Sequence, residues 1–331
     1  MILPTRYLLA TALLPVTFVS ANPEYGVGFE LTLDYGVASI QFPNGSHVEV
    51  AKIEGNPSYK HRMRTADVQE DDAYIAPDTQ TTVGWPSFRD YLPPWLGGHN
   101  NTNKHLSGML KSLKIAIESY QEASVSTAEI TVPFPISGTF YDTLRSAAKS
   151  VSISIPATPA APAGRLAALH VYGIGPGKCD YYPSPSDPPD PAQVFLTVEY
   201  TRSALTALLI VEECGLYEDL RVLHETHLGS QESPQDIRAE LTTALGDVVK
   251  MPIEYDGESF KSLSNVVLLG ESSESQILQD VLKELLGKQQ RSGINTSVVD
   301  QHKDPVSRVF AASVAAARLD LIRSNFDRDE I

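Results

Sequence analysis

Residues 194–215, VFLTVEYTRSALTALLIVEECG, contain side chains of the kind that could hold a phosphate group. The stretch has the pattern of two apolar strands joined by a polar centre. That centre holds a carboxylate, two hydroxyls and a guanidinium, namely Glu199, Thr201, Ser203 and Arg202. Arginine suits phosphate because its planar fork of donors matches phosphate oxygens. The question is whether this hairpin binds a phosphate group or only keeps the shape of a phosphate-binding hairpin.

Other patterns in the chain give weaker indications of chemistry. HETH, residues 224–227, places two histidines on opposite faces without a third ligand nearby, so we expect solvated or loop histidines and no metal site. LLGESSE does not match the Gly-x-Ser-x-Gly elbow of hydrolases. We therefore assign no catalytic residue and no metal ligand.

The composition limits the class of partner. The chain has 331 residues, 42% of them hydrophobic, and a formal net charge of −15. This length is enough for two lobes or one large α/β unit. The acidic balance argues against nucleic acid and against anionic membrane surfaces, because both require a basic footprint. A protein partner remains open, and its identity cannot be inferred from the sequence.

The N-terminus has the pattern of a signal peptide. Arg6 precedes an apolar stretch at residues 7–19 that is too short to span a bilayer, and VSA at residues 19–21 predicts cleavage after Ala21. No later run is apolar enough for a membrane span. We expect a secreted protein or one in the lumen of the secretory pathway. Three glycosylation sequons fit that compartment, at Asn44, Asn100 and Asn295.

The two cysteines, Cys179 and Cys214, have two interpretations. In an oxidising compartment a single disulfide is the simpler one, worth about 3–4 kcal/mol in the chain-entropy model. The alternative is a pair of buried free thiols.

Strand and helix patterns alternate in two sets, which is typical of an α/β protein. Asn44-Gly45 predicts a hairpin between the first strands, and residues 54–103 have no regular pattern. The predicted strands lie at 26–42, 47–53, 127–134, 151–157, 194–215 and 264–272. The predicted helices lie at 103–121, 141–151, 165–174, 233–249, 273–288 and 304–324.

Three details of these helices are specific enough to test. The first helix should bury Leu106, Leu110, Leu113 and Ile117. The fourth should begin with Ser233 as cap and Pro234 in its first turn. The fifth should bury Ile277, Val281, Leu282 and Leu285 and stop at Gly287. The aromatic-rich segment at 84–98 is either a docking patch or a loop packed onto its own lobe.

Six stretches in one order resemble the nucleotide-binding domain of the seventy-kilodalton heat-shock chaperones, members of the actin-like ATPase superfamily. They are the opening hairpin from Gly26, the helix–TVP strand–helix unit at 110–154, AALHVYGI, THLGS, NVVLLGESSESQILQDVLKELLG, and DPVSRVFAASVAAARL. The resemblance implies an α/β, ribonuclease H-like fold of two lobes. After the signal peptide at 1–21, it implies a first lobe at 22–170, a second lobe at 171–303 and a returning C-terminal helix at 304–331. The second lobe is truncated, because only residues 230–266 stand where the chaperones insert a helical subdomain.

The departures from the family fall on the positions that would hold nucleotide. The family uses carboxylates for the hydrated metal and water, and glycines where backbone N–H groups approach phosphates. Its Asp-Leu-Gly-Thr-Thr loop is here Glu30, Leu31, Thr32, Leu33, Asp34. Its Asp-Leu-Gly-Gly-Gly-Thr-Phe-Asp loop is here Glu199, Tyr200, Thr201, Arg202, Ser203, Ala204, Leu205, Thr206. Its adenosine loop is here Gly270, Glu271, Ser272, Ser273, Glu274.

Further family positions are also changed. The family's catalytic glutamate and the Pro-Thr after it are replaced by Gly164, Arg165 and Leu166. No lysine of this sequence can be assigned to the family's catalytic lysine. The acids Glu30, Asp34, Glu271 and Glu274 should line the degenerate cleft and repel a triphosphate. We therefore expect a pseudoenzyme that acts as a binding or scaffold module without a cofactor. The alternative is an active chaperone-like ATPase that uses ATP and Mg²⁺ through unorthodox loops.

Overall fold

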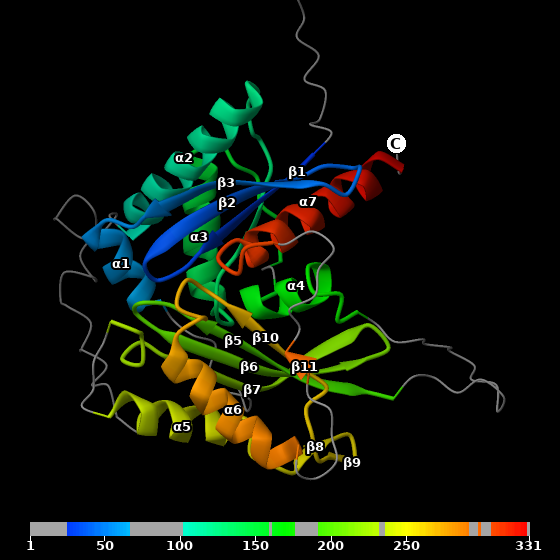
Figure 1. Cartoon of the computed structure of the whole chain (residues 1–331). Helices are drawn as coiled ribbons and strands as arrows, with labels where there is room; N and C mark the ends of the chain where they lie inside the picture. The colour runs from blue at the N-terminus through cyan, green and yellow to red at the C-terminus, as the bar shows by residue number, and fades with distance from the viewer. Residues whose placement is uncertain are drawn as a thin grey trace, which may run out of the picture.

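The structure is a computed structural model that describes residues 25–66, 102–158, 161–175, 191–231, 236–290, 297–298 and 306–329. It is a mixed α/β protein, as the alternating patterns predict (Figure 1). Several features of the sequence lie outside the described residues: the signal peptide, Cys179, Asn100, Asn295 and the aromatic-rich segment at 84–98.

The first sheet has the strand order β3-β2-β1-β4. Its strands are β1 (Gly26–Leu31), β2 (Tyr35–Gln41), β3 (His47–Glu54) and β4 (Glu129–Thr131). Strand β2 is antiparallel to both β1 and β3, and β4 runs parallel to β1. The Asn44-Gly45 turn joins β2 to β3, with Gly45 at φ +88°, so the predicted hairpin is confirmed.

Three helices accompany this sheet: α1 (Pro57–Arg64), α2 (Thr102–Gln121) and α3 (Gly138–Ser150). The predicted apolar row on α2 is confirmed, since Leu106, Leu110, Leu113 and Ile117 are fully buried. This row packs into the core beneath β2 and β3. We call the first sheet with α1, α2 and α3 the first lobe.

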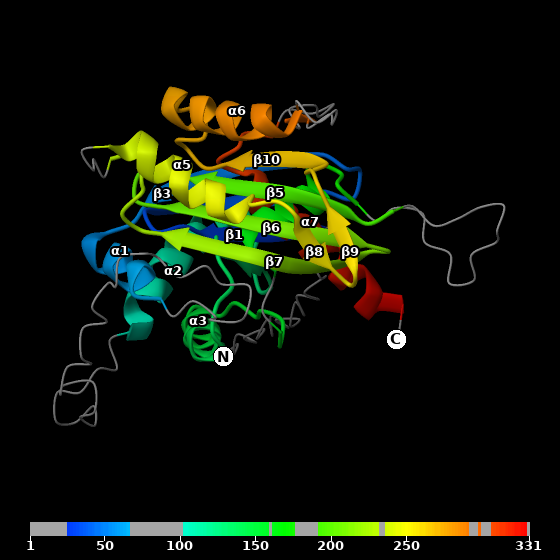
Figure 2. The same cartoon turned by 90° about the horizontal axis from the view of Figure 1, so that it is seen from below.

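The second sheet has the strand order β11-β10-β5-β6-β7. Its strands are β5 (Gln193–Tyr200), β6 (Leu205–Glu213), β7 (Leu216–Glu225), β10 (Asn265–Leu269) and β11 (Ser297–Val298). The outer face is covered by α5 (Ile237–Val248) and α6 (Gln276–Gln290), with the hairpin β8 (Ile253–Tyr255) and β9 (Glu258–Phe260) nearby (Figure 2). We call this sheet with α5, α6 and β8–β9 the second lobe.

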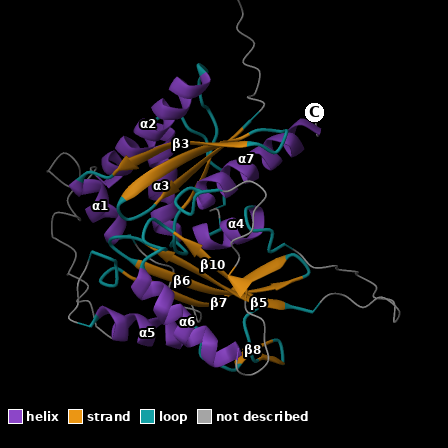
Figure 3. Ribbon diagram, viewed as in Figure 1, coloured by secondary structure: helices purple, strands orange, loops and turns teal. Residues whose placement is uncertain are grey.

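Two helices lie between the sheets, α4 (Ala163–His170) and α7 (Ala311–Asp329) (Figure 3). Helix α7 packs on β1 and β2, and α4 packs on both α7 and the second sheet. The approach of α7 is so close that a Cβ on Gly28 would lie 2.0 Å from the carbonyl oxygen of Ser313. Bare backbone on β1 and small residues on α7 therefore set the spacing of the inner layers.

The structure corrects four local predictions. No strand forms at 151–157, where an isolated bridge joins Thr127 to Ser154, because Val151 caps α3 and Ser152, at φ +58°, completes the turn that ends that helix. Part of the segment at 54–103 is helical: Asn56 caps α1 and Pro57 occupies its first turn. Helix α5 is capped by Asp236 rather than Ser233, because the Asp236 side chain accepts a hydrogen bond from the Ala239 amide.

The fourth correction concerns α6, which buries Leu278 and leaves Ile277 41% exposed. Both residues fit helical spacing with Val281, but it is Leu278 that belongs to the core cluster of the second lobe. The helix also continues past Gly287 to Gln290, because a glycine with open space around it does not end a helix by itself. Among the described residues no helix is both long and apolar enough to cross a bilayer.

The contact between α7 and β1 predicts a specific mutational effect. Gly28→Ala should destabilise the protein by about 1–3 kcal/mol, because its Cβ meets backbone atoms that cannot turn aside. Gly108→Ala is the matched control, since it lies within α2 with nothing within 4 Å of the added Cβ. The control should stabilise the protein by about 0.5–1 kcal/mol. Denaturant unfolding measures both, and a neutral Gly28→Ala would contradict the close packing of α7.

Candidate functional site

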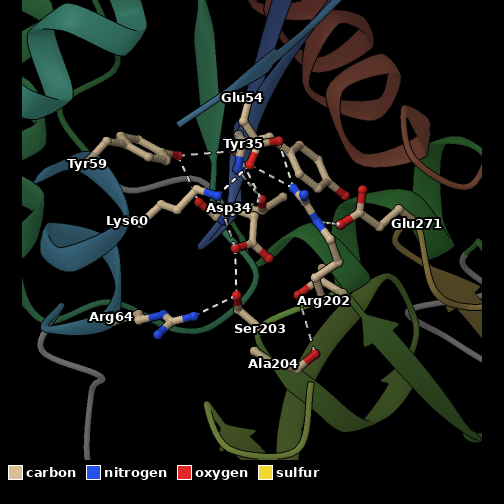
Figure 4. Close-up of polar contacts among 12 residues, drawn as sticks. Asp34, Tyr35, Glu54, Tyr59, Lys60, Arg64, Arg202, Ser203, Ala204 and Glu271 are labelled. Carbon is tan, nitrogen blue, oxygen red and sulfur yellow. Dashed lines mark hydrogen bonds and ion pairs between the residues drawn. The ribbon is translucent and has the colours of Figure 1, made fainter. Parts of the chain in front are cut away.

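The turn between β5 and β6, residues 201–204, crosses from the second lobe into the first (Figure 4). The amide of Thr201 donates to the carbonyl of Ala204 at 3.0 Å and closes the turn. Ala204 is buried within the core cluster of the first lobe. The turn therefore carries side chains of the second lobe into contact with the first.

Two loops of the second lobe support this turn through their backbones. The Ser230 amide donates to the Thr201 carbonyl, and the Ser272 amide donates to the Tyr200 carbonyl, each at 3.0 Å. Glycines permit both approaches: a Cβ on Gly229 would lie 2.2 Å from the Arg202 carbonyl oxygen, and one on Gly270 would lie 2.5 Å from that of Tyr200. These glycines are needed for contact between chain segments.

The turn between β1 and β2 presents the opposite side of the site. Thr32 is buried, and its hydroxyl accepts hydrogen bonds from the amides of Asp34 and Tyr35 at 3.2 and 3.1 Å. The Tyr59 hydroxyl donates to the Thr32 carbonyl at 2.7 Å. The Thr32 side chain and the Tyr59 ring thus fix this turn, and through it the direction of Asp34.

Arg202 joins the two lobes. Its Nη2 donates to both carboxylate oxygens of Glu54 at 2.9 and 2.7 Å, and its Nε donates to Glu271 Oε1 at 2.6 Å. Glu54 ends β3 in the first lobe, whereas Glu271 follows β10 in the second. Lys52 also pairs with Glu271, and its ammonium lies 4.1 Å from the centroid of the Tyr35 ring.

A second chain of contacts runs through Ser203. Its hydroxyl donates to Asp34 Oδ1 at 2.5 Å and accepts from Arg64 Nη2 at 2.7 Å. Lys60 pairs with Glu54, and its Nζ lies 3.9 Å from Asp34 Oδ1. We call the whole arrangement the seam, made of Asp34, Tyr35, Lys52, Glu54, Lys60, Arg64, Arg202, Ser203, Ala204 and Glu271.

Hydrogen bonding shifts the ionisation of two members of the seam. Burial tends to raise the pKa of Glu54, but donors from Lys60 and Arg202 outweigh it and hold that pKa below its usual value. The Glu54 carboxylate in turn raises the pKa of Arg202, with Glu271 adding to the effect. Both groups therefore stay charged across the ordinary pH range.

Two of the four acids that the sequence predicts to repel a triphosphate already have compensating partners within the protein. Glu271 is paired with Arg202 and Lys52, and Asp34 accepts from Ser203 with Lys60 beside it. Glu274 is exposed to solvent. The compensating cations come mainly from β3 and α1, and sequence reasoning missed them. Asn56-Pro57 was a usable signal for α1, but no pattern indicated where its basic side chains would point.

Glu30 and Glu199 differ from the other acids, because both are buried and neither forms an ion pair with a cation among the described residues. Glu30 lies on β1 and Glu199 on β5. Both oxygens of Glu199 lack a hydrogen bond within the part of the chain described. Burial raises the pKa of Glu199 to about 8, and burial together with the charge of Glu199 raises that of Glu30 well above its usual value.

The two histidines of HETH have different environments. His224 is buried rather than solvated: its Nδ1 shares a 2.8 Å hydrogen bond with Thr206 Oγ1, and its ring centroid lies 4.2 Å from that of Phe134 in the first lobe. Burial lowers its pKa to about 4. His227 is 45% exposed in its side chain and lies 2.9 Å from Glu225. His224 is thus a neutral contact between the lobes.

The remaining predicted sites are distributed outside the seam. Asn44 is exposed in the turn between β2 and β3. Cys214 lies between β6 and β7, and because Cys179 is outside the described residues the disulfide stays a prediction. Gly164 begins α4 against β5, where an added Cβ would lie 2.2 Å from Thr197 Oγ1.

Comparison with known proteins adds no identification. No protein-family model matches the chain, and no curated protein matches it in a sequence search.

The charged seam predicts unequal coupling energies. In a double-mutant cycle, Arg202→Gln and Glu271→Gln should couple by about 1–2 kcal/mol, because the Glu271 side chain is only 16% exposed. Arg202→Gln and Glu54→Gln should couple by about 0.5 kcal/mol, since Glu54 is 51% exposed. Denaturant unfolding at low and high salt measures both, and salt should weaken them.

The exposed pair Arg238–Glu284, 3.4 Å apart, is the matched control and should show coupling near zero. A coupling of Arg202 with Glu54, the pair that crosses between the lobes, no larger than in this control would contradict a role for the seam in joining the lobes.

Proposed function

We propose that the chain is a secreted binding or scaffold module on an actin-like ATPase fold that has lost nucleotide turnover. The observation that carries the proposal is Arg202 at the tip of the β5–β6 turn, paired with Glu54 of one lobe and Glu271 of the other. Side chains of the protein occupy the place where such a fold would cradle phosphate.

The topology supports the actin-like assignment. Each lobe contains an antiparallel set of three consecutive strands, β1–β3 and β5–β7. In each, a later strand then pairs in parallel with the first of the three, β4 with β1 and β10 with β5. The same arrangement twice, with two helices between the sheets, is what the resemblance implies for a two-lobed, ribonuclease H-like fold.

The residues present do not fit a triphosphate. Phosphate-binding loops need bare backbone with free N–H groups. Here the Ser203 hydroxyl is engaged by Asp34 and Arg64, and the Thr32 hydroxyl is engaged by its own turn. Binding of phosphate would have to break these contacts and place its charge beside Asp34. The guanidinium of Arg202 already has two carboxylate partners.

Two further features argue against the family chemistry. A catalytic glutamate at position 164 would collide with Thr197, because even a Cβ there lies 2.2 Å from its hydroxyl oxygen. The last aspartate of the second family loop is here Thr206, an uncharged hydroxyl that shares a 2.8 Å hydrogen bond with His224 Nδ1. The two lobes are joined by the hydrogen bonds and ion pairs of the seam. A two-lobed protein held in this way offers a fixed surface for recognition.

Nucleotide addition tests this proposal directly. At millimolar ATP with Mg²⁺ the melting temperature should shift by less than about 1 °C, because a ligand whose dissociation constant is far above its concentration adds almost no stability. No phosphate should be released. MgCl₂ alone is the necessary control, since a chain of net charge −15 can bind the cation without specificity. A saturable shift of several degrees that depends on ATP would refute the proposal.

Secretion has its own test, expression in a eukaryotic secretory host. The protein recovered from the medium should begin at Asn22, the residue after the predicted cleavage site. Asn44→Gln should remove one glycan from its mass, since Asn44 is exposed and its sequon lies in a turn. Retention of Met1, with no change of mass in the variant, would contradict the secretory assignment.

A further inference from the structure

Glu30 and Glu199 face the same interlobe space from opposite sides. On β1, Glu30 lies on the same face of the strand as Gly26 and Gly28, which pack under α7 and so face the second lobe. On β5, Glu199 lies on the same face as Phe195, which packs with α4 and α7 and so faces the first lobe. Each side chain is 4% exposed. One buried carboxyl from each lobe therefore meets the other across the gap.

The surroundings offer this pair little stabilisation of negative charge. Neither oxygen of Glu199 receives a hydrogen bond from the described residues. The titratable groups around the pair are themselves acidic or phenolic: Tyr35 from β2 interacts with both carboxyls, Tyr59 from α1 interacts with Glu30, and Asp34 and Glu271 act on the same Tyr35. The nearby cations Lys52, Lys60, Arg64 and Arg202 are directed at Glu271, Glu54, Ser203 and Asp34.

Two ionised carboxylates cannot share such a space without cost. Each loses its hydration on burial, and each repels the other in a medium of low dielectric constant. Protonation of one removes the repulsion and supplies an O–H donor for the other. Separation of the lobes is the alternative, because it readmits water to both carboxylates.

We propose that Glu30 and Glu199 form a proton-dependent latch between the lobes, closed while at least one carboxyl is protonated and loosened when both are ionised. The latch acts beside the Arg202 seam and opposes it when the carboxyls ionise. It concerns how the lobes are held together, and it depends on neither a nucleotide nor a partner.

The direction of the pH effect follows from the raised pKa values. A carboxyl whose pKa is higher in the folded protein than in the unfolded chain stabilises the fold fully below the unfolded value of about 4.5. That stability is lost as the pH rises to the folded value, which for Glu199 is about 8. Closed lobes are thus favoured in acid and weakened from pH 5 to 8.

The effects of other groups that titrate between pH 5 and 8 must be distinguished from the effect of Glu30 and Glu199. Burial raises the pKa of Glu129 to about 7 and that of Asp320 to about 6, where α7 packs on β4 and β1. His224 is already neutral above pH 5, because its pKa is about 4. A variant of Glu129 therefore serves as the control for titration within one lobe.

The test compares the wild type, Glu30→Gln/Glu199→Gln and Glu129→Gln from pH 5 to 9. Glutamine keeps the shape of a protonated carboxyl and cannot ionise. Two readouts are needed: the melting temperature, and the distance between labels on unnatural amino acids at Tyr120 and Arg238. These sites are exposed and lie on the outer helices of the two lobes, α2 and α5.

As the pH rises, we expect the melting temperature of the wild type to fall by several degrees more than that of the double variant. The distance between the labels should widen only in proteins that keep both Glu30 and Glu199. Glu129→Gln should widen like the wild type. The latch would be overturned if the melting temperatures of the wild type and the double variant changed with pH in parallel. It would also be overturned if the double variant lost the pH dependence while the label distance in the wild type did not change with pH. If the double variant fails to fold, Glu199→Gln alone is measured against the same two criteria.

Discussion

The guanidinium of Arg202 binds carboxylates of both lobes at once. It donates to Glu54 at the end of the first sheet and to Glu271 after a strand of the second. Three hydrogen bonds from one planar group fix direction as well as distance, which lysine could not do. The position of the 201–204 turn, the burial of Ala204 and the contact of Ser203 with Asp34 all require the lobes to stay at this separation.

The same interface also holds charge that opposes closure. Glu30 and Glu199 are desolvated without compensating donors, while the seam a short distance away pairs its acids with cations from β3 and α1. Attraction and repulsion therefore act together between the lobes. The proposed latch makes their balance depend on the protonation of Glu30 and Glu199.

The glycines near the interface allow close contacts between parts of the protein. Bare backbone at Gly229 and Gly270 admits another segment of the same chain, with carbonyl oxygens at distances where a Cβ could not fit. At Gly28 and Gly164 it admits a helix and a threonine side chain. In a phosphate site the same absence of side chains would admit a ligand. The close contacts here are all between parts of the protein, which agrees with the proposed loss of turnover.

The sequence by itself determined the features that depend on neighbours along the chain. Periodic apolar residues predicted α2 and its buried row, Asn44-Gly45 predicted a hairpin, and the alternation of elements predicted the α/β class. Local signals were also present but overlooked at Asn56-Pro57 before α1 and at Asp256-Gly257, whose positive φ angles turn the β8–β9 hairpin.

Only the tertiary structure decided which charges meet. Arg202 and Glu54 are far apart in the sequence, and nothing in the spacing of either indicates the other. The same holds for Leu278 over Ile277 on α6, and for the burial of His224 against Phe134. Periodicity records which face of an element is apolar, because that face repeats along the chain. The partner of a single polar side chain leaves no such repeat, so it is fixed only when the lobes come together.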